Sequence, residues 1–236
     1  MICFQKQLAS GLGLLAIVVG LVVPSTASAM TATNGASQQG RPVLLLEGMI
    51  KQGDGAKIVR TLKQRGFREV WLSSPGGSVN DGYQIGNALR RLGMMTRIPD
   101  GKICASSCVD VFLGGVVRFV NPSGKIIIHP GSISAVPQAT KLLEEAVRTG
   151  QSTKAIQLFE QSATAETATW TRYLTSMGVS LDLVAYAAKV PHRCGIVLSR
   201  DELVYFNVVN TAGAPRPGYR PSNPRKIGSD SACKQG

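Results

Sequence analysis

Short apolar runs and amphipathic segments alternate along the first half of the chain. The apolar runs 43–46, 70–72 and 94–98 have the length of buried strands. Between them, segments 56–65 and 81–92 place apolar residues three and four positions apart, which is the spacing of one helix face. Strands that alternate with helices are joined by crossover connections, so this half of the chain predicts an α/β fold.

The second half of the chain is mostly helical in pattern. Its apolar residues predict packing faces, including Trp170, Tyr173 and Leu174, which we expect to pack on the core. A short helix is predicted at 106–113, and two strands joined by an Asn-Pro-Ser-Gly turn are predicted at 116–120 and 125–129. Three longer helices follow at 137–150, 153–177 and 181–189, and residues 204–209 predict a late strand or a helix end.

The first 29 residues have the pattern of a cleaved export signal. Lys6 precedes an uninterrupted apolar and glycine run over 11–23, and a small-x-small site follows at Ala27-Ser28-Ala29. A run of this length is too short for a membrane-spanning helix, which needs about 20 residues. We therefore expect a soluble mature protein in the bacterial periplasm or outside the cell, beginning at Met30. No second membrane span is predicted.

The rest of the chain divides into three parts. Residues 30–41 are small and polar and predict a flexible leader. Residues 42–210 predict one α/β domain, and a chain of this size can bury a substantial core. Residues 211–236 are rich in proline, glycine and basic side chains and predict an irregular tail.

The chain is strongly basic, with 26 Lys and Arg against 14 Asp and Glu and a net charge of +12. Such a balance can attract nucleic acids or anionic membrane surfaces. The basic residues are scattered, however, and no aromatic residues are interleaved with them in a stacking pattern. We therefore expect a solvated basic surface and no specific nucleic-acid partner.

Four cysteines remain once Cys3 is removed with the signal, and an even number in an exported chain predicts disulfides. Three pairings are possible, and the simplest joins neighbours in the sequence. A zinc site that adds His129 and His192 is the alternative, but the spacing matches no zinc motif, so we expect no metal and no cofactor. The cysteines of the simplest pairing are Cys104 with Cys108 and Cys194 with Cys233.

Ser106 is the first candidate for chemistry. It stands where a glycine loop passes through small residues into a helix, and a helix N-terminus offers free N–H donors. A serine needs a neighbouring base to become a nucleophile and nearby N–H groups to hold the oxyanion that forms. The structural alternative is an ordinary N-cap serine, which by itself is the more frequent reason for a serine at this place.

Two further features supply the missing parts of a serine hydrolase. Gly76 and Gly77 follow a buried strand, so their backbone can bend sharply and offer N–H groups to an oxyanion. His129 ends an apolar strand and could accept the proton of a serine. Each has a purely structural alternative, namely a plain strand-to-helix turn and a histidine satisfied by the backbone.

The three features occur together in the order of one known family. The run Ser74-Pro75-Gly76-Gly77-Ser78-Val79 resembles the Ser-Pro-Gly-Gly turn of the Clp protease proteolytic subunit. Cys104-Ala105-Ser106-Ser107-Cys108 resembles its Ala-Ser nucleophile turn, and Ile126 to His129 with Pro130 resembles its Ile-His-Gln-Pro strand end without the glutamine. Leu198-Ser199 with Glu202 resembles its Leu-Ser-x-x-Glu-Ala run. The likeness is greatest to a periplasmic branch of the Clp and crotonase-like superfamily with a Cys-x-Ser-x-Cys turn.

The resemblance implies a Clp/crotonase-like fold of repeated ββα units with a helical insert at about 137–177. It implies that Ser106 is the nucleophile, that His129 is the general base, and that the N–H groups of Ser107 and of Gly76 or Gly77 form the oxyanion hole. It further implies a ring-forming homo-oligomer that hydrolyses peptide bonds through an acyl-enzyme. Since the periplasm lacks ATP, we expect the substrates to be peptides or unfolded chains.

The chain departs from that family at the third catalytic residue. No carboxylate occurs between Asp182 and Asp201, the interval in which the family has its catalytic aspartate. Asp182, Asp201, His192 or a backbone carbonyl could orient His129 instead, and a Ser-His dyad is also workable. The gap equally fits a binding or scaffold protein that has lost the chemistry.

Two other enzyme classes fit the same motifs less well. A crotonase-like acyl-thioester enzyme would lack its acyl-CoA substrate outside the cytoplasm. A Ser-Lys peptidase would use Lys125 or Lys102 as its base, but His129 already occupies the matching place.

Overall fold

Two sheets with helices packed around them form the body of the protein in the computed structural model, which describes residues 28–64, 66–131, 137–211, 213, 216–229 and 233. The expected export signal lies outside the described residues, apart from its last two residues. The strands are β1 Thr31–Ala36, β2 Pro42–Glu47, β3 Glu69–Ser73, β4 Met95–Ile98, β5 Ile103–Ala105, β6 Val117–Val120, β7 Lys125–Ile128, β8 Gly195–Val197 and β9 Lys226–Ile227. The helices are α1 Asp54–Gln64, α2 Val79–Arg91, α3 Ser107–Leu113, α4 Pro137–Arg148, α5 Ser152–Ser176, α6 Asp182–Ala187 and α7 Arg200–Tyr205.

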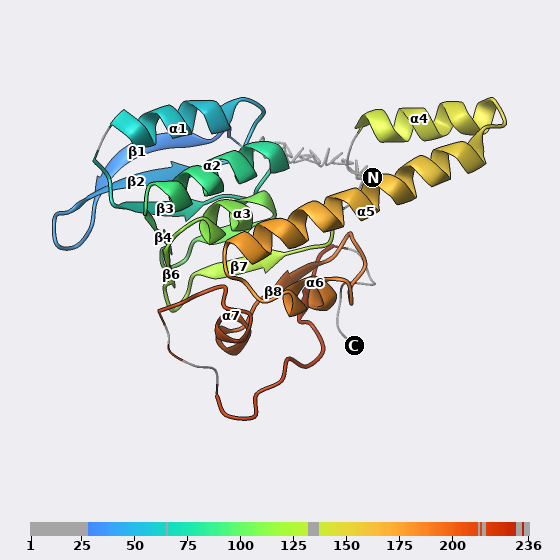
Figure 1. The fold of residues 1–236 in the computed structure, drawn as a ribbon. Coiled ribbons are helices and arrows are strands. Elements are labelled where there is room, and N and C mark those ends of the chain that lie inside the picture. The colour runs from blue at the N-terminus through green and yellow to red at the C-terminus, as the bar shows by residue number, and fades with distance from the viewer. Residues whose placement is uncertain are drawn as a thin grey trace, which may run out of the picture.

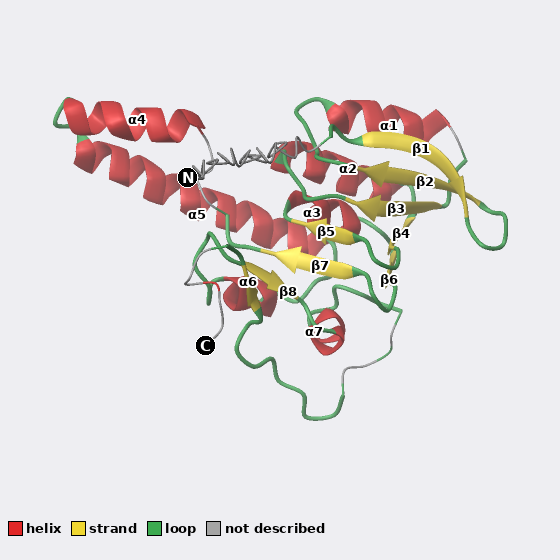
Figure 2. Cartoon of the chain, turned by 180° about the vertical axis from the view of Figure 1, so that it is seen from behind, coloured by secondary structure: helices red, strands yellow, loops and turns green. Residues whose placement is uncertain are grey.

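The first sheet has the order β1-β2-β3-β4-β6 and is parallel except for the β1–β2 pair. The second has the order β5-β7-β8-β9, with β5 and β7 parallel and the other pairs antiparallel. Helices α1, α2 and α3 lie along one side of the sheets, and the α4–α5 hairpin projects beyond them (Figure 1; Figure 2 from behind). The predicted α/β class and helical insert are therefore confirmed. None of the described helices is both long and apolar enough to cross a membrane.

Several elements differ from the sequence prediction. Residues 31–36, expected in a flexible leader, form strand β1 on the edge of the first sheet. Its side chains are almost all exposed, so no apolar pattern in the sequence predicts it. The strand is held by backbone hydrogen bonds to β2. Strand β5 also occurs where we expected a loop. The two strands predicted on either side of the 121–124 turn are present as β6 and β7, and they belong to different sheets.

The C-terminal part is more ordered than its composition predicts. Residues 204–209 continue from helix α7, so the helix end, not the late strand, is correct. In the tail, β9 pairs with β8, and a disulfide joins Cys194 to Cys233. At the start of α7, Ser199 and Glu202 form a capping box, so the Leu-Ser-x-x-Glu run has a structural role here.

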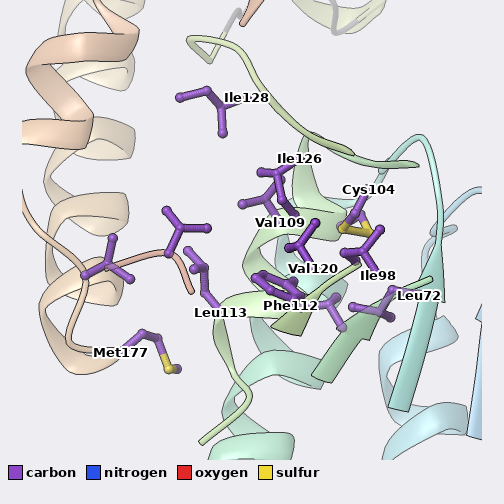
Figure 3. Close-up of a cluster of buried hydrophobic side chains, with 14 of the residues drawn as sticks. Leu72, Ile98, Cys104, Val109, Phe112, Leu113, Val120, Ile126, Ile128 and Met177 are labelled. Carbon is purple, nitrogen blue, oxygen red and sulfur yellow. A yellow bond between two sulfur atoms is a disulfide. The ribbon is translucent and has the colours of Figure 1, made fainter. Parts of the chain in front are cut away.

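The apolar core joins both sheets and the C-terminal end of α5. In Figure 3, Phe112 of α3 lies among Leu72, Ile98 and Val120, and Leu113 lies on the side toward Met177. Tyr173 and Leu174 are buried and Trp170 packs against the core, as predicted. The core therefore fixes one end of α5, while the α4–α5 hairpin leaves large apolar side chains exposed, among them Leu142, Val147 and Ile156.

A buried arginine ties three helix ends together. Arg118 of β6 is 1% exposed and donates hydrogen bonds to five backbone carbonyls. These carbonyls belong to residues at or just after the C-terminal ends of α3, α5 and α7. The last carbonyls of a helix have no hydrogen-bond partner within that helix. The five carbonyls belong to Leu113, Gly115, Met177, Asn207 and Val208.

We predict that Arg118→Met lowers the free energy of unfolding by about 3 kcal/mol or more, because it leaves several buried carbonyls without a donor. Denaturant unfolding of the oxidised protein measures this. Arg41→Met is the matched control, since Arg41 is exposed, and should change stability by less than about 0.5 kcal/mol. Equal effects of the two substitutions would contradict the proposed tie.

Candidate active site

Three parallel strand ends bring the candidate residues together. The end of β3 pairs with β5 through Ser74 and Cys104, and β5 pairs in parallel with β7. Because parallel strands end at the same edge, the glycine turn after β3, Ser106 after β5 and His129 after β7 meet at one edge. Ser106 and His129 line a common cavity of about 230 Å³.

Ser106 has an unusual backbone conformation. Its φ of 55° and ψ of −133° lie outside the regions that side-chain-bearing residues normally adopt, and such strain is concentrated at functional sites. Although Ser106 precedes α3, its side chain makes no capping hydrogen bond. The N-cap explanation for this serine is therefore wrong. A serine on a sharp turn between a strand and a helix is the geometry of a nucleophile elbow.

The glycine turn lies directly against Ser106. A methyl group added to Gly76 would come within 2.6 Å of Ser106 Cβ and 3.0 Å of the Ser107 nitrogen. A methyl group on Gly77 would meet the Ile50 carbonyl oxygen at 2.1 Å. Both positions also have positive φ, so only glycine fits this close approach.

The N–H groups near Ser106 differ in whether they are free. The Gly76 N–H donates to Ser74 Oγ at 3.0 Å. Neither Gly77 N–H nor Ser107 N–H has a hydrogen-bond partner among the described residues, and Ser107 is the first residue of α3. Of the two glycines considered for an oxyanion hole, Gly77 is therefore the one with a free donor.

His129 is exposed at the mouth of the cavity. Its Nδ1 lies 2.9 Å from the carbonyl oxygen of Pro130. Since a carbonyl only accepts, this contact places the proton on Nδ1 and leaves Nε2 free to accept one. Among the described residues, the Ser106 hydroxyl has no hydrogen bond to His129, a contact that in ligand-free enzymes is often long and tightens when substrate binds.

Among the described residues, none of the three considered as a third member has a hydrogen bond or ion pair with His129. Asp182 is exposed at the start of α6. Asp201 forms a salt bridge with Arg216, and His192 is exposed outside the cavity. Only the alternative of a backbone carbonyl matches a contact, the one with Pro130.

Two carboxylic acids that sequence reasoning missed line the cavity. Asp110 lies on α3, one turn after Ser106, and is 7% exposed. Glu166 comes from α5, and its Oε1 would lie 2.8 Å from a methyl group on Gly131, two residues after His129. The sequence prediction placed the third residue within 182–201, whereas α3 and the helical insert bring these two carboxylic residues to the cavity. The signal available was the spacing of Asp110 from Ser106, which places it on the adjacent turn.

The environment of Asp110 is apolar and crowded. The pKa of its carboxyl is raised from 3.8 to about 8, mainly by burial and to a smaller extent by the negative charge of Glu166, while a hydrogen bond from Trp170 opposes the shift. Its backbone carbonyl accepts a hydrogen bond from Tyr173 at 2.5 Å. Asp110 is therefore mostly neutral at pH 7.

Both predicted disulfides are present, and one encloses Ser106. Cys104 and Cys108 lie 5.3 Å apart at Cα and flank the nucleophile turn, and both are buried. Figure 3 shows the Cys104 sulfur at the core, near Ile98 and Ile126. No cluster of metal-ligating side chains occurs in the part of the chain that the structure describes.

Comparison with known proteins finds matches among solved structures. No protein-family model matches the chain, and no curated protein matches it. Solved structures do match, among them a point mutant of ClpP1 from Listeria monocytogenes, with 18% sequence identity and a TM-score of 0.45. That match covers 71% of this chain and 88% of the other.

We predict that stability depends on pH through Asp110. Its folded-state pKa lies above the unfolded value of about 4, so the unfolded state binds fewer protons and the free energy of unfolding falls as pH rises from about 4 to about 8. Asp110→Asn cannot lose a proton and should flatten this decline. Denaturant midpoints of both proteins between pH 4 and 9 provide the test, and parallel curves would contradict it.

We also predict that the disulfide around Ser106 is needed for a reactive turn. The Cys104→Ala/Cys108→Ala protein should react with a fluorophosphonate probe at least about tenfold more slowly, because small misplacements of a nucleophile cost large factors in rate. Circular dichroism checks that the fold is kept. The Cys194→Ala/Cys233→Ala protein is the matched control and should react normally. Loss of reactivity in both, or in neither, would argue against a specific role.

Proposed function

We propose that this protein is an exported Clp-like serine hydrolase, most simply a peptidase acting on peptides or unfolded chains without ATP. The observation that carries the proposal is the strained conformation of Ser106 beside a glycine turn with a free N–H group. A backbone held outside its normal regions at a nucleophile candidate is expected where a site is preorganised. The sequence motifs that resemble the Clp family support the same assignment.

In the proposed reaction, His129 Nε2 takes the proton of the Ser106 hydroxyl as Oγ attacks a peptide carbonyl. The Gly77 and Ser107 N–H groups receive the oxyanion, and the N-terminus of α3 adds its positive end. His129 then returns the proton to the leaving amine, and water hydrolyses the acyl-enzyme by the reverse steps. The Pro130 carbonyl holds the imidazole in the required tautomer.

Export and assembly belong to the same proposal. The signal-like N-terminus and two disulfides support an oxidising compartment such as the periplasm. Assembly into a homo-oligomer is supported by the apolar side chains exposed on the α4–α5 hairpin.

We predict that a fluorophosphonate probe labels the oxidised protein, and that both Ser106→Ala and His129→Ala abolish labelling. The first change removes the nucleophile and the second its base. His192→Ala is the matched control and should leave labelling unchanged, because His192 is exposed and lies outside the cavity. Gel fluorescence measures labelling, and circular dichroism confirms folding.

Absence of labelling in the folded, oxidised protein would contradict the proposed hydrolase activity. The same fold would then be a binding or scaffold protein, for which the lack of a hydrogen-bonded carboxylate at His129 is the supporting observation among the described residues.

A further inference from the structure

The cavity beside Ser106 is narrow and mostly apolar along its walls. Its volume of about 230 Å³ is below the roughly 300–1,000 Å³ of sites that hold drug-sized ligands, so it suits one long side chain. The apolar walls come from α2, α3, β7 and α6. They are formed by Val79, Val109, Ile128, Val184, Ala187 and Ala188.

The cavity is lined by carboxylic residues, whereas the protein as a whole is basic. The chain carries a net charge of +12, yet no lysine or arginine is among the described residues that line the cavity. The carboxylic residues that line it are Asp110 and Glu166. The negative charge of Glu166, and that of Asp110 once a cation is bound, favours cationic ligands over anionic ones.

Groups suited to a cation with N–H donors lie next to Asp110. The Ser107 hydroxyl is buried and has no hydrogen-bond partner among the described residues, a costly arrangement that a ligand donor would relieve. Tyr83 and Trp170 add aromatic rings, whose faces attract cations. The cavity thus combines walls for an apolar stem with acceptors for a charged end.

From this arrangement we infer that the cavity is the specificity pocket of the proposed hydrolase and takes the lysine or arginine side chain of a peptide, with its cationic end at Asp110. The inference rests on the proposed function, since it takes Ser106 to attack the peptide bond next to that side chain. Glu166, at the exposed surface of α5, adds negative charge to the approach.

The ionisation of Asp110 is compatible with this ligand. Burial, with a smaller contribution from Glu166, raises the pKa of the carboxyl to about 8, which keeps it mostly neutral while no cation is bound. A cation within a few ångströms favours the carboxylate, so the proton leaves to solvent as the side chain enters. The buried carboxylate then has the partner that a buried charge requires.

The test compares internally quenched peptides that differ at one position, which is lysine, arginine, norleucine or glutamine. Norleucine keeps the stem of lysine and lacks its ammonium group, so the ratio of kcat/KM for lysine over norleucine isolates the charge. The wild-type ratio should be at least about tenfold. In Asp110→Asn it should fall to within about threefold of unity. Asp182→Asn, a change of an exposed carboxylate outside the cavity, should keep the wild-type ratio.

A wild-type ratio near or below unity would overturn the inference without any variant, as would equal ratios in Asp110→Asn and Asp182→Asn. Binding of the same peptides to Ser106→Ala, measured by fluorescence anisotropy, separates the two proposals. If lysine peptides bind more tightly than norleucine peptides, but the fluorophosphonate probe does not label the wild-type protein, the pocket assignment stands and the hydrolase assignment fails. Probe labelling with no preference in binding or cleavage would retain the hydrolase and reject the pocket.

Discussion

The fold depends on one buried arginine, Arg118, which holds three helix C-termini together through hydrogen bonds to backbone carbonyls. The ends of α3, α5 and α7 converge, and each carries unpaired carbonyls and the negative end of its dipole. Arg118 occupies the point where they meet, and Arg90 adds hydrogen bonds to the carbonyls of Leu113 and Met177. Burial and the nearby Arg90 lower the pKa of Arg118 to about 10, so it stays charged at neutral pH. Five carbonyl acceptors replace the water that a buried guanidinium loses.

This tie has a consequence for the site, because it fixes the direction of α5. The C-terminal end of α5 is anchored at Met177, and Tyr173 one turn earlier bonds to the backbone of Asp110. Gly86 on α2 allows that contact, since a methyl group there would lie 2.0 Å from the Tyr173 hydroxyl. With its end fixed in this way, α5 carries Trp170 and Glu166 to the cavity wall. The helical insert therefore builds part of the site besides projecting from the body.

The Ser106 turn is strained, and the surrounding structure keeps it so. It is held on one side by Gly76, on another by the Cys104–Cys108 disulfide, and along the backbone by the hydrogen bond from Ser106 N–H to Ile127. These restraints come from three separate strand ends. A turn over-determined in this way can keep a serine in a conformation that costs about 1–3 kcal/mol, and that free energy is supplied by the packing of the fold.

The sequence by itself determined the α/β class, most helix bounds and the placing of Ser106 and His129 at element ends, because these follow from local periodicity and turn chemistry. It left three disulfide pairings possible, and the structure has the simplest of them. It could not find β1, whose exposed side chains carry no pattern, nor the contact between Gly76 and Ser106, which joins residues 30 positions apart in sequence. Only the tertiary structure decided that Gly77 keeps the free N–H, and that the Pro130 carbonyl contacts His129 while Asp201 pairs with Arg216. It also brought Asp110 and Glu166 to the cavity, since side chains from α3 and α5 meet only after the core has packed. The physical reason is that spacing along a chain fixes which face a residue occupies, whereas its partners are fixed by what packs against that face.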